Sequence, residues 1–342
     1  MYHLLQENKS ISSDMHYCGD SIVCEYDGFI EIFDEKTKNR IEINEKFAIE
    51  NTNTSEYLLV STKNKILKIS MSNLLIETLV DFPPVQRRQI KFVNDIDAIC
   101  REKDNDKWFL RGVSLTSELI KWEVENDTTF TVEVVGDFVL LTDSEKNSIL
   151  TCRSLKTGGV LWQADVAELG RYENFEGKVV DGSIREVYTD GDLVVAKVIS
   201  YGLAAYRMAT GKFVWGHKGG NAGYYLVALY NNNFHIFSDF YYEVDAQTGK
   251  KLRQEEFAPL LKQVGFRSYW LTQPAVNEKY IAIASHYDSA ILLINRADFT
   301  VAQRIDLEGC QNGIPLPNTP RFHGNRLFQF DGDGTLHVFQ ED

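Results

Sequence analysis

Two glycine-rich segments have residue types that could bind an ion. The run Asp331-Gly332-Asp333-Gly334 begins like a calcium-binding loop, but its glycine is not at the sixth position and no glutamate stands at the twelfth. A tight turn between two strands explains this run better. The segment 216–223 (GHKGGNAG) could cradle an anion, yet it opens no helix, so a phosphate site has little support. We therefore predict no metal and no cofactor.

Patterns typical of catalysis are missing. The sequence has no HExxH, GxSxG or GxxxxGK[ST] motif, so zinc peptidase, hydrolase and P-loop chemistry lack support. The seven histidines are isolated from one another, and His235 and His337 lie in apolar runs, where a structural histidine is expected. We predict no catalytic residue, and we expect that the protein is not an enzyme.

The composition indicates which classes of partner and which cellular compartment to expect. The 342 residues carry a formal charge of -13, which disfavours nucleic acids and anionic membranes, so we predict neither as a partner. No apolar stretch reaches the roughly 18 residues of a membrane helix, and the N-terminus lacks the pattern of a signal peptide. The five scattered cysteines suit free thiols in a reducing compartment. We expect a cytoplasmic protein.

The elements that must position any site form a repeat. Short apolar runs, separated by tight turns, recur along the whole chain at spacings of 36 to 55 residues, about 44 on average. Such turns suit residues that tolerate a positive φ or bond their own backbone. The eight turns are centred on Gly19, Ser55, Asn94, Gly136, Gly191, Asn232, Asn277 and Gly324.

This period predicts an all-β protein built as a single closed β-propeller of four-stranded antiparallel blades. We expect eight blades; seven is the alternative, if a weak unit such as 47–80 is misread. The last unit ends without an outer strand, while the first has surplus residues at its front. We expect this N-terminal strand to complete the last blade. We therefore predict one domain over residues 1–342.

Three units share a longer pattern: residues 152–162 read CRSLKTGGVLW, residues 205–215 AYRMATGKFVW and residues 243–253 EVDAQTGKKLR. The pattern resembles the tryptophan-docking motif of quinoprotein-type (pyrroloquinoline-quinone-like) propeller repeats: Ala, any, Asp, two of any, Thr, Gly, three of any, Trp. Arg253 replaces the last tryptophan, and a degenerate copy ends at Trp122. The blade-docking residues are Trp122, Thr157, Gly158, Trp162, Thr210, Gly211, Trp215, Asp245, Thr248 and Gly249.

The resemblance implies an architecture and leaves the chemistry open. The family's dehydrogenases hold a quinone and calcium in the central channel. They are usually longer and exported, and they often carry an adjacent pair of cysteines, which this sequence lacks. Other relatives are lipoprotein scaffolds of outer-membrane assembly, but Cys18 stands in no lipidation box. We place the chain in the non-catalytic branch of the family.

Loop length selects one side of the blades. Strands alternate in direction, so the D–A and B–C connections of a blade lie on the same side, and the long connections are all of the D–A kind. Long loops on a rigid scaffold often carry function, and Arg, Tyr and Trp are frequent hot spots of interfaces. The candidate partner-binding residues are Arg87, Arg88, Arg171, Tyr172, Phe175, His217, Arg267, Tyr269 and Trp270.

We predict a monomeric, non-catalytic protein-binding scaffold that uses this side of the blades. One version is an acidic inhibitor or immunity-type protein that covers a basic partner. The alternative is an enzyme or a small-ligand binder, directed at a sugar or a carboxylate, with its site at the mouth of the central channel.

Overall fold

The computed structural model describes two compact units. Unit 1 comprises Met1–Met15, Ser21–Glu42 and Gly219–Asp342, and unit 2 comprises His16–Asp20 and Ile43–Lys218. The expectation of a single domain stays a prediction. The structure describes all residues except 10–13, 19–20, 34–36, 51–55, 63–64, 82–87, 94–96, 105–106, 115–116, 118, 126–128, 144–146, 174–175, 220–224 and 268–269.

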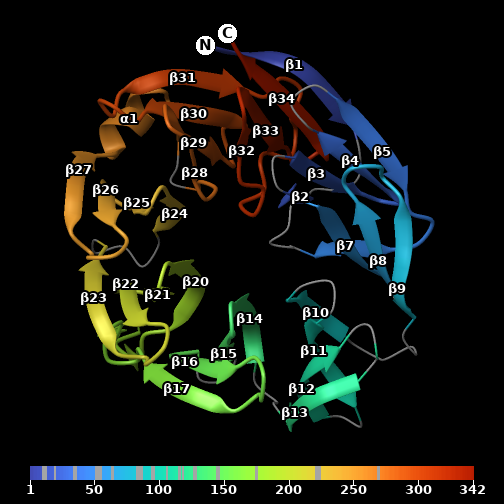
Figure 1. The fold of residues 1–342 in the computed structure, drawn as a ribbon. Helices are drawn as coiled ribbons and strands as arrows, with labels where there is room; N and C mark the ends of the chain where they lie inside the picture. The colour runs from blue at the N-terminus through green and yellow to red at the C-terminus, as the bar shows by residue number, and fades with distance from the viewer. Residues whose placement is uncertain are drawn as a thin grey trace. The chain divides into compact units, whose positions relative to one another are not determined.

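The described residues form eight four-stranded antiparallel sheets, and these sheets are the blades of a β-propeller (Figure 1). The predicted all-β class and the count of eight blades are confirmed. In each blade the four strands follow one another in the chain, apart from the last blade. Blade 1 consists of β2 (Asp14–Cys18), β3 (Ser21–Tyr26), β4 (Phe29–Phe33) and β5 (Lys38–Glu42).

Unit 2 contains four complete blades and a small hairpin. The hairpin lies in the D–A connection 166–183 and consists of β18 (Tyr172–Glu173) and β19 (Val179–Val180). The blades are, in chain order, β6 (Phe47–Glu50), β7 (Tyr57–Thr62), β8 (Lys65–Ser70) and β9 (Ile76–Asp81); β10 (Arg88–Phe92), β11 (Asp97–Asp104), β12 (Lys107–Ser114) and β13 (Leu119–Glu125); β14 (Thr129–Val135), β15 (Phe138–Asp143), β16 (Ile149–Ser154) and β17 (Val160–Asp165); and β20 (Ile184–Asp190), β21 (Leu193–Val198), β22 (Gly202–Arg207) and β23 (Phe213–Lys218).

Unit 1 contains blades 6 to 8. Blade 6 consists of β24 (Leu226–Tyr230), β25 (Asn233–Phe237), β26 (Phe240–Asp245) and β27 (Lys251–Glu256). Blade 7 consists of β28 (Ala275–Val276), β29 (Tyr280–Ser285), β30 (Ala290–Asn295) and β31 (Val301–Asp306). Blade 8 consists of β32 (Arg321–His323), β33 (Arg326–Phe330), β34 (Thr335–Glu341) and the N-terminal strand β1 (Tyr2–Lys9).

The N-terminal strand completes blade 8, as the sequence predicts. Strand β1 runs antiparallel to β34, with Tyr2 opposite Glu341 and Lys9 opposite Thr335. The Tyr2 side chain is buried in the core of blades 7 and 8. Since the pairing covers an edge of β34 that would otherwise expose unpaired backbone groups, β1 protects the unit from edge-to-edge association.

The core of each unit lies between neighbouring blades. Every residue of β21 is buried, whereas exposed and half-buried residues alternate on the outer strand β27 from Leu252 on. A strand that is covered on both faces suits a continuous apolar run, and an outer strand suits alternation. Turns with positive φ join the strands, for example at Gly191 (φ 56°) and Asn232 (φ 59°).

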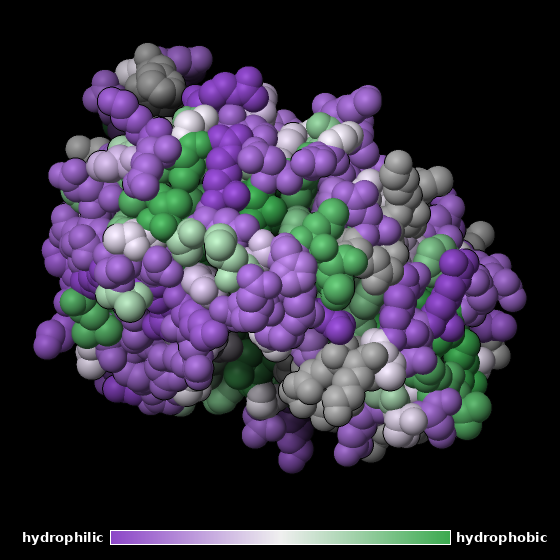
Figure 2. Space-filling view, turned by 90° about the horizontal axis from the view of Figure 1, so that it is seen from above, coloured by the Kyte–Doolittle hydropathy of each residue, from purple (hydrophilic) through white to green (hydrophobic). Residues whose placement is uncertain are grey.

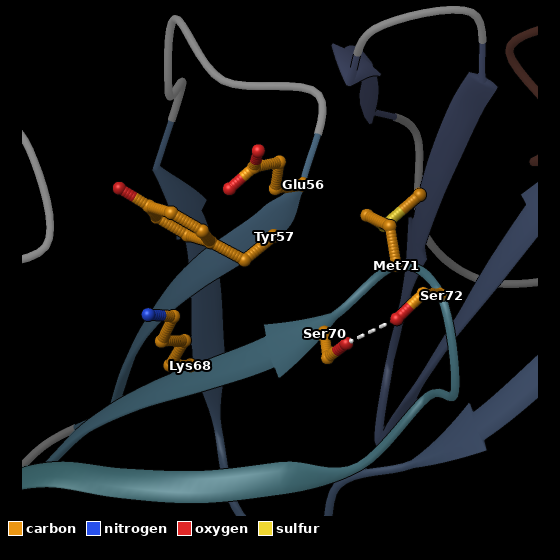
Figure 3. Close-up of a pocket in the computed structure, with 6 residues that line it drawn as sticks. All are labelled: Glu56, Tyr57, Lys68, Ser70, Met71 and Ser72. Carbon is orange, nitrogen blue, oxygen red and sulfur yellow. Dashed lines mark hydrogen bonds between the residues drawn. The ribbon is translucent and has the colours of Figure 1, made fainter.

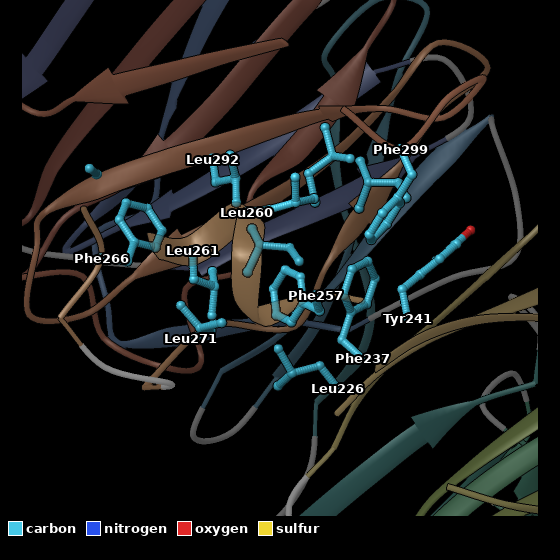
Figure 4. Packing of buried hydrophobic residues seen from close by; sticks show 14 residues of the cluster. Leu226, Phe237, Tyr241, Phe257, Leu260, Leu261, Phe266, Leu271, Leu292 and Phe299 are labelled. Atoms are coloured by element: carbon cyan, nitrogen blue, oxygen red, sulfur yellow. The ribbon is translucent and has the colours of Figure 1, made fainter. Parts of the chain in front are cut away.

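The helix α1 (Ala258–Gln263) anchors the D–A connection between blades 6 and 7. Its Leu260 and Leu261 are buried, together with Phe257 before it and Phe266 after it. Figure 4 shows these side chains packed against blade strands, where Phe237 and Phe257 meet edge to face at 4.9 Å between ring centroids. This long loop is therefore held by its own apolar core.

The face drawn in Figure 2 is mainly polar. In the view of Figure 2 hydrophilic side chains predominate, and the hydrophobic patches are small and separated. Among the helices that the structure describes, none has the length and apolar character to cross a membrane. All five cysteines are free thiols; Cys310 is half-buried and the other four are buried.

Candidate functional site

Two tryptophans of the repeat motif join neighbouring blades of unit 2. Trp122 lies against Gly158 of blade 4 and donates from Nε1 to the Leu155 carbonyl at 2.7 Å. Trp162 makes the same contacts one blade further, with Gly211 and, at 2.7 Å, the Met208 carbonyl. Both glycines have positive φ, and a Cβ at either would overlap the indole ring. The two tryptophans therefore hold neighbouring blades together, and their side chains have no group that could act in catalysis.

In unit 1, polar side chains take the place of the docking tryptophan. Arg253 donates from Nη1 to the Arg296 carbonyl at 2.5 Å, and its guanidinium lies 5.7 Å from the centre of the Phe299 ring. Gln303 holds the corresponding position on β31 and makes two hydrogen bonds to the Tyr2 backbone, at 2.8 and 2.7 Å. In both places a side chain of the outer strand therefore contacts the next blade, although this side chain is not a tryptophan.

The remaining motif residues lie at the end of the third strand, in the turn that follows it or on the outer strand. The Thr248 hydroxyl and backbone N–H both donate to the Asp245 carboxylate, at 2.6 and 2.7 Å, and these hydrogen bonds lower the pKa of Asp245. Thr157 and Thr210 occupy the equivalent turns of unit 2, Gly249 has φ 68°, and Trp215 is buried on β23.

The structure separates the nine candidate partner-binding residues. Arg87, Phe175 and Tyr269 lie outside the described residues, and Arg88 is described only as backbone of β10. His217, predicted in a loop, belongs to the outer strand β23, opposite Leu203. Arg171 and Tyr172 lie in the hairpin of unit 2, whereas Arg267 and Trp270 lie together in unit 1.

Ion pairs and a close backbone contact hold the hairpin of unit 2. Arg171 bridges Glu168 and Asp181, with nitrogen–oxygen distances of 2.7 and 2.9 Å. At its base, a Cβ on Gly170 would stand only 2.8 Å from the Gly182 Cα. The two glycines allow this crossing, so the hairpin has a defined base. Arg171 serves the hairpin itself, and Tyr172 is exposed beside it.

The candidate site is a group of side chains on the D–A and B–C side of blade 7, which we call the Trp270–Tyr287 surface. Its members come from the connection before β28 and from the turn between β29 and β30. The backbone joins these segments, since the His286 N–H donates to the Trp270 carbonyl at 2.9 Å. The surface consists of Arg267, Trp270, His286, Tyr287 and Asp288.

Arg267 and Asp288 fasten the two segments of the surface. The Arg267 Nε donates to Asp288 Oδ1 at 2.8 Å and its backbone N–H to Oδ2 at 3.1 Å, while Nη2 donates to the Tyr287 carbonyl. Burial disfavours the charged form of Asp288, but hydrogen bonds from Ser285 and Arg267 outweigh it and lower the pKa of this carboxyl. Arg267 is thus a structural clamp.

The aromatic rings of the surface face solvent. Trp270 is 54% exposed and Tyr287 is 51% exposed, and their ring centroids lie 5.8 Å apart at 58°. The His286 ring meets Tyr287 edge-on at 4.8 Å, and its Nδ1 lies 2.9 Å from the Ile314 carbonyl. The arrangement offers an amphipathic contact area on an ordered frame, which is typical of interface hot spots.

The turn at 331–334 joins β33 and β34, as its sequence predicts, and it lies beside the loop before blade 8. Cys310, Asp331 and Asp333 bring potential ligand atoms within 4.8 Å of one another. Asp331 Oδ1 accepts the N–H groups of Asp333 and Thr335, and Oδ2 contacts His337 Nε2 at 2.8 Å. Hydrogen-bond donors therefore already organise these carboxylates, and a cation would have to displace them.

A shallow hollow of about 580 Å³ lies in blade 2, and no predicted site residue lines it (Figure 3). The Lys68 ammonium lies 4.4 Å from the centre of the Tyr57 ring, and the Ser70 and Ser72 hydroxyls are 3.1 Å apart. Glu56 and Met71 complete its lining. These residues are scattered over two strands and a turn and follow no known motif, so the sequence carries no signal for them.

The sequence matches no family model and no curated protein. In structure, the chain is similar to BamB from Moraxella catarrhalis, a propeller of the pyrroloquinoline-quinone-like repeat type, with a TM-score of 0.63, 14% identity and full coverage of both chains. It is similar as well to the computationally designed protein Ika8, with a TM-score of 0.65, 13% identity, and coverage of 99% of this chain and 98% of Ika8. These likenesses concern the fold.

Proposed function

We propose that the protein is a non-catalytic, protein-binding propeller and that the Trp270–Tyr287 surface is its contact surface. One observation carries the proposal: two large aromatic side chains, each about half exposed, lie side by side on a frame fixed by an ion pair and by backbone hydrogen bonds. A large apolar side chain left in water forgoes about 1.5–3 kcal/mol of burial free energy, which a partner can recover.

The frame favours binding because it is ordered before the partner arrives. Arg267 ties the loop to the B–C turn, and Phe266 and Leu271 on either side of the surface are buried in the core of blades 6 and 7. A preorganised surface loses little conformational entropy on association. The fold supports the proposal only in a general sense, since propellers serve many functions.

The experiment places a photo-crosslinking phenylalanine analogue at Tyr287 in cells of the native organism. The matched control places it at Leu252, which is also half exposed and lies in unit 1 on the outer strand β27. We expect a covalent adduct with another protein from position 287 and none from position 252, and the adduct should fade in a Trp270→Ala background. Equal crosslinking from both positions would refute the assignment.

We further propose a cytoplasmic monomer. The five cysteines are free thiols, and four of them are buried. Free thiols persist in a reducing compartment, whereas an oxidising compartment favours disulfides, so the cysteines support the first. Cell fractionation and light scattering test this part. An oxidised or membrane-bound pool, or a stable dimer, would contradict it. The alternative of an enzyme or small-ligand binder at the channel mouth stays a prediction.

A further inference from the structure

The Trp270–Tyr287 surface has an acidic surrounding. Four segments of unit 1 form or adjoin it: the connection 257–271, the turn 286–289, the loop 307–320 and the turn 331–334. Together they carry four carboxylates against two cations, as the sequence shows. A partner that covers these rings would meet more negative than positive charge.

The charged groups of these four segments are not equivalent. The Arg267 cation is matched by Asp288, which accepts two hydrogen bonds from it. Asp333 accepts from the Gln311 N–H at 2.5 Å and from the Asn312 amide, both of which belong to the loop 307–320. Apart from the pair of Arg267 and Asp288, the four segments carry three carboxylates and one cation. The local field therefore attracts a cation more than an anion.

The same chain repeatedly places cations against its own aromatic rings. The Arg40 guanidinium lies 3.6 Å from the centre of the Phe29 ring, and that of Arg101 lies 4.1 Å from the centre of the Trp108 ring. A cation over an aromatic face is stabilised by the ring quadrupole, and tryptophan is the best acceptor. The exposed Trp270 and Tyr287 rings offer aromatic faces, and the acidic surrounding attracts positive charge. Together they can bind a cation from another molecule.

We propose that the Trp270–Tyr287 surface receives a basic side chain, arginine or lysine, of a protein partner. This inference rests on the proposed function and adds the chemistry of the partner. The guanidinium or ammonium group stacks on the exposed rings, and Asp333 with the neighbouring carboxylates supplies longer-range attraction. The clamp between Arg267 and Asp288 keeps the resident cation away from that role.

The test uses the full chain labelled with 5-fluorotryptophan and fluorine NMR. The protein has five tryptophans, and Trp270→Phe identifies the resonance of interest. The probes are a blocked peptide, Gly-Arg-Gly-Arg-Gly, and its twin with citrulline, which keeps the shape of arginine and removes its charge. We expect the arginine peptide to shift the Trp270 resonance, and the citrulline peptide to bind about tenfold more weakly.

Variants sharpen the result. Tyr287→Leu keeps an apolar side chain but removes the aromatic face, and it should weaken the arginine peptide about threefold or more. Leu252→Ala, the matched control in unit 1, should bind as the parent does. Higher salt should weaken binding of the arginine peptide. Equal affinities for the two peptides, or no shift of Trp270 with either, would overturn the inference.

The inference and the proposed function fail separately. If position 287 crosslinks to a protein in cells, yet the arginine peptide neither shifts Trp270 nor competes with that protein, the contact surface stands and the basic side chain is wrong. If the arginine peptide shifts Trp270 but position 287 forms no adduct, the cation preference stands and the contact surface is wrong.

Discussion

Replacing Trp162 with alanine should destabilise unit 2 strongly, because this side chain joins blade 4 to blade 5. It is only 8% exposed, it packs against Gly211, and its Nε1 donates to the Met208 carbonyl at 2.7 Å. Alanine removes the ring, leaves a cavity between blades and strips that carbonyl of its donor.

The contacts set the expected magnitude. Buried Phe or Trp to Ala changes cost about 3–5 kcal/mol, so we expect a loss of that size in the free energy of unfolding. Trp162→Phe keeps most of the apolar area and deletes the hydrogen bond, which should cost about 1–2 kcal/mol. Leu161→Ala, at the adjacent and half-exposed position, should cost less than about 1 kcal/mol.

Urea unfolding followed by circular dichroism measures these losses, because tryptophan fluorescence would change with the substitution itself. The order of stability should be parent and Leu161→Ala, then Trp162→Phe, then Trp162→Ala. A Trp162→Ala protein as stable as the Leu161→Ala control would refute the docking role.

Three more predictions concern pH, polar docking and the N-terminal strand. Burial lowers the pKa of His235 to about 4 from an ordinary 6.5. As the pH falls from about 6.5 to about 4, the unfolded chain therefore binds a proton at His235 that the folded chain does not bind. The free energy of unfolding should drop by up to about 3 kcal/mol there, and urea titrations of His235→Gln should lack this component; an unchanged pH slope would contradict it. Arg253→Ala removes the hydrogen bond to the Arg296 carbonyl and should cost about 1–3 kcal/mol in thermal unfolding, whereas an unaltered melting temperature would show that Arg253 does not dock. Deleting Met1–Lys9 exposes the edge of β34 and should cause self-association in light scattering; a monodisperse protein with the parent's melting temperature would argue against that role.

Much of the fold follows from local sequence. Turn residues such as Gly191 and Asn232 mark hairpins because they accept a positive φ, and their spacing sets the number of blades. The Thr-Gly turn followed by Trp162 predicts docking because its parts are close in sequence. These features can be predicted without knowing which residues of the neighbouring blades they contact.

Long-range pairing is harder to predict. Arg253 and Gln303 take the place of tryptophan by donating hydrogen bonds to backbone carbonyls of the next blade. The residues near them in the sequence do not indicate which carbonyls these are. His217 extends β23 beyond the predicted strand because ladder pairing with Leu203 continues there. The candidate site shows the same limit.

Loop length singled out Trp270 and Arg267, but it could not reveal that they meet the turn at His286-Tyr287-Asp288. That turn is short and polar, and it lies 16 residues beyond Trp270 in the chain. The two segments join because 270–272 pairs with the end of β29 and because Arg267 bonds to Asp288. The aromatic pair is therefore a product of tertiary contact.

Hydrogen exchange of the protein, measured alone and in its crosslinked complex, tests whether the Trp270–Tyr287 surface contacts the partner. We expect slower exchange in the peptides that contain the backbone amides of Phe266–Leu271 and His286–Ser289, and unchanged exchange in the outer strand β27. Protection confined to other segments, such as the hollow lined by Tyr57 and Lys68, would contradict it.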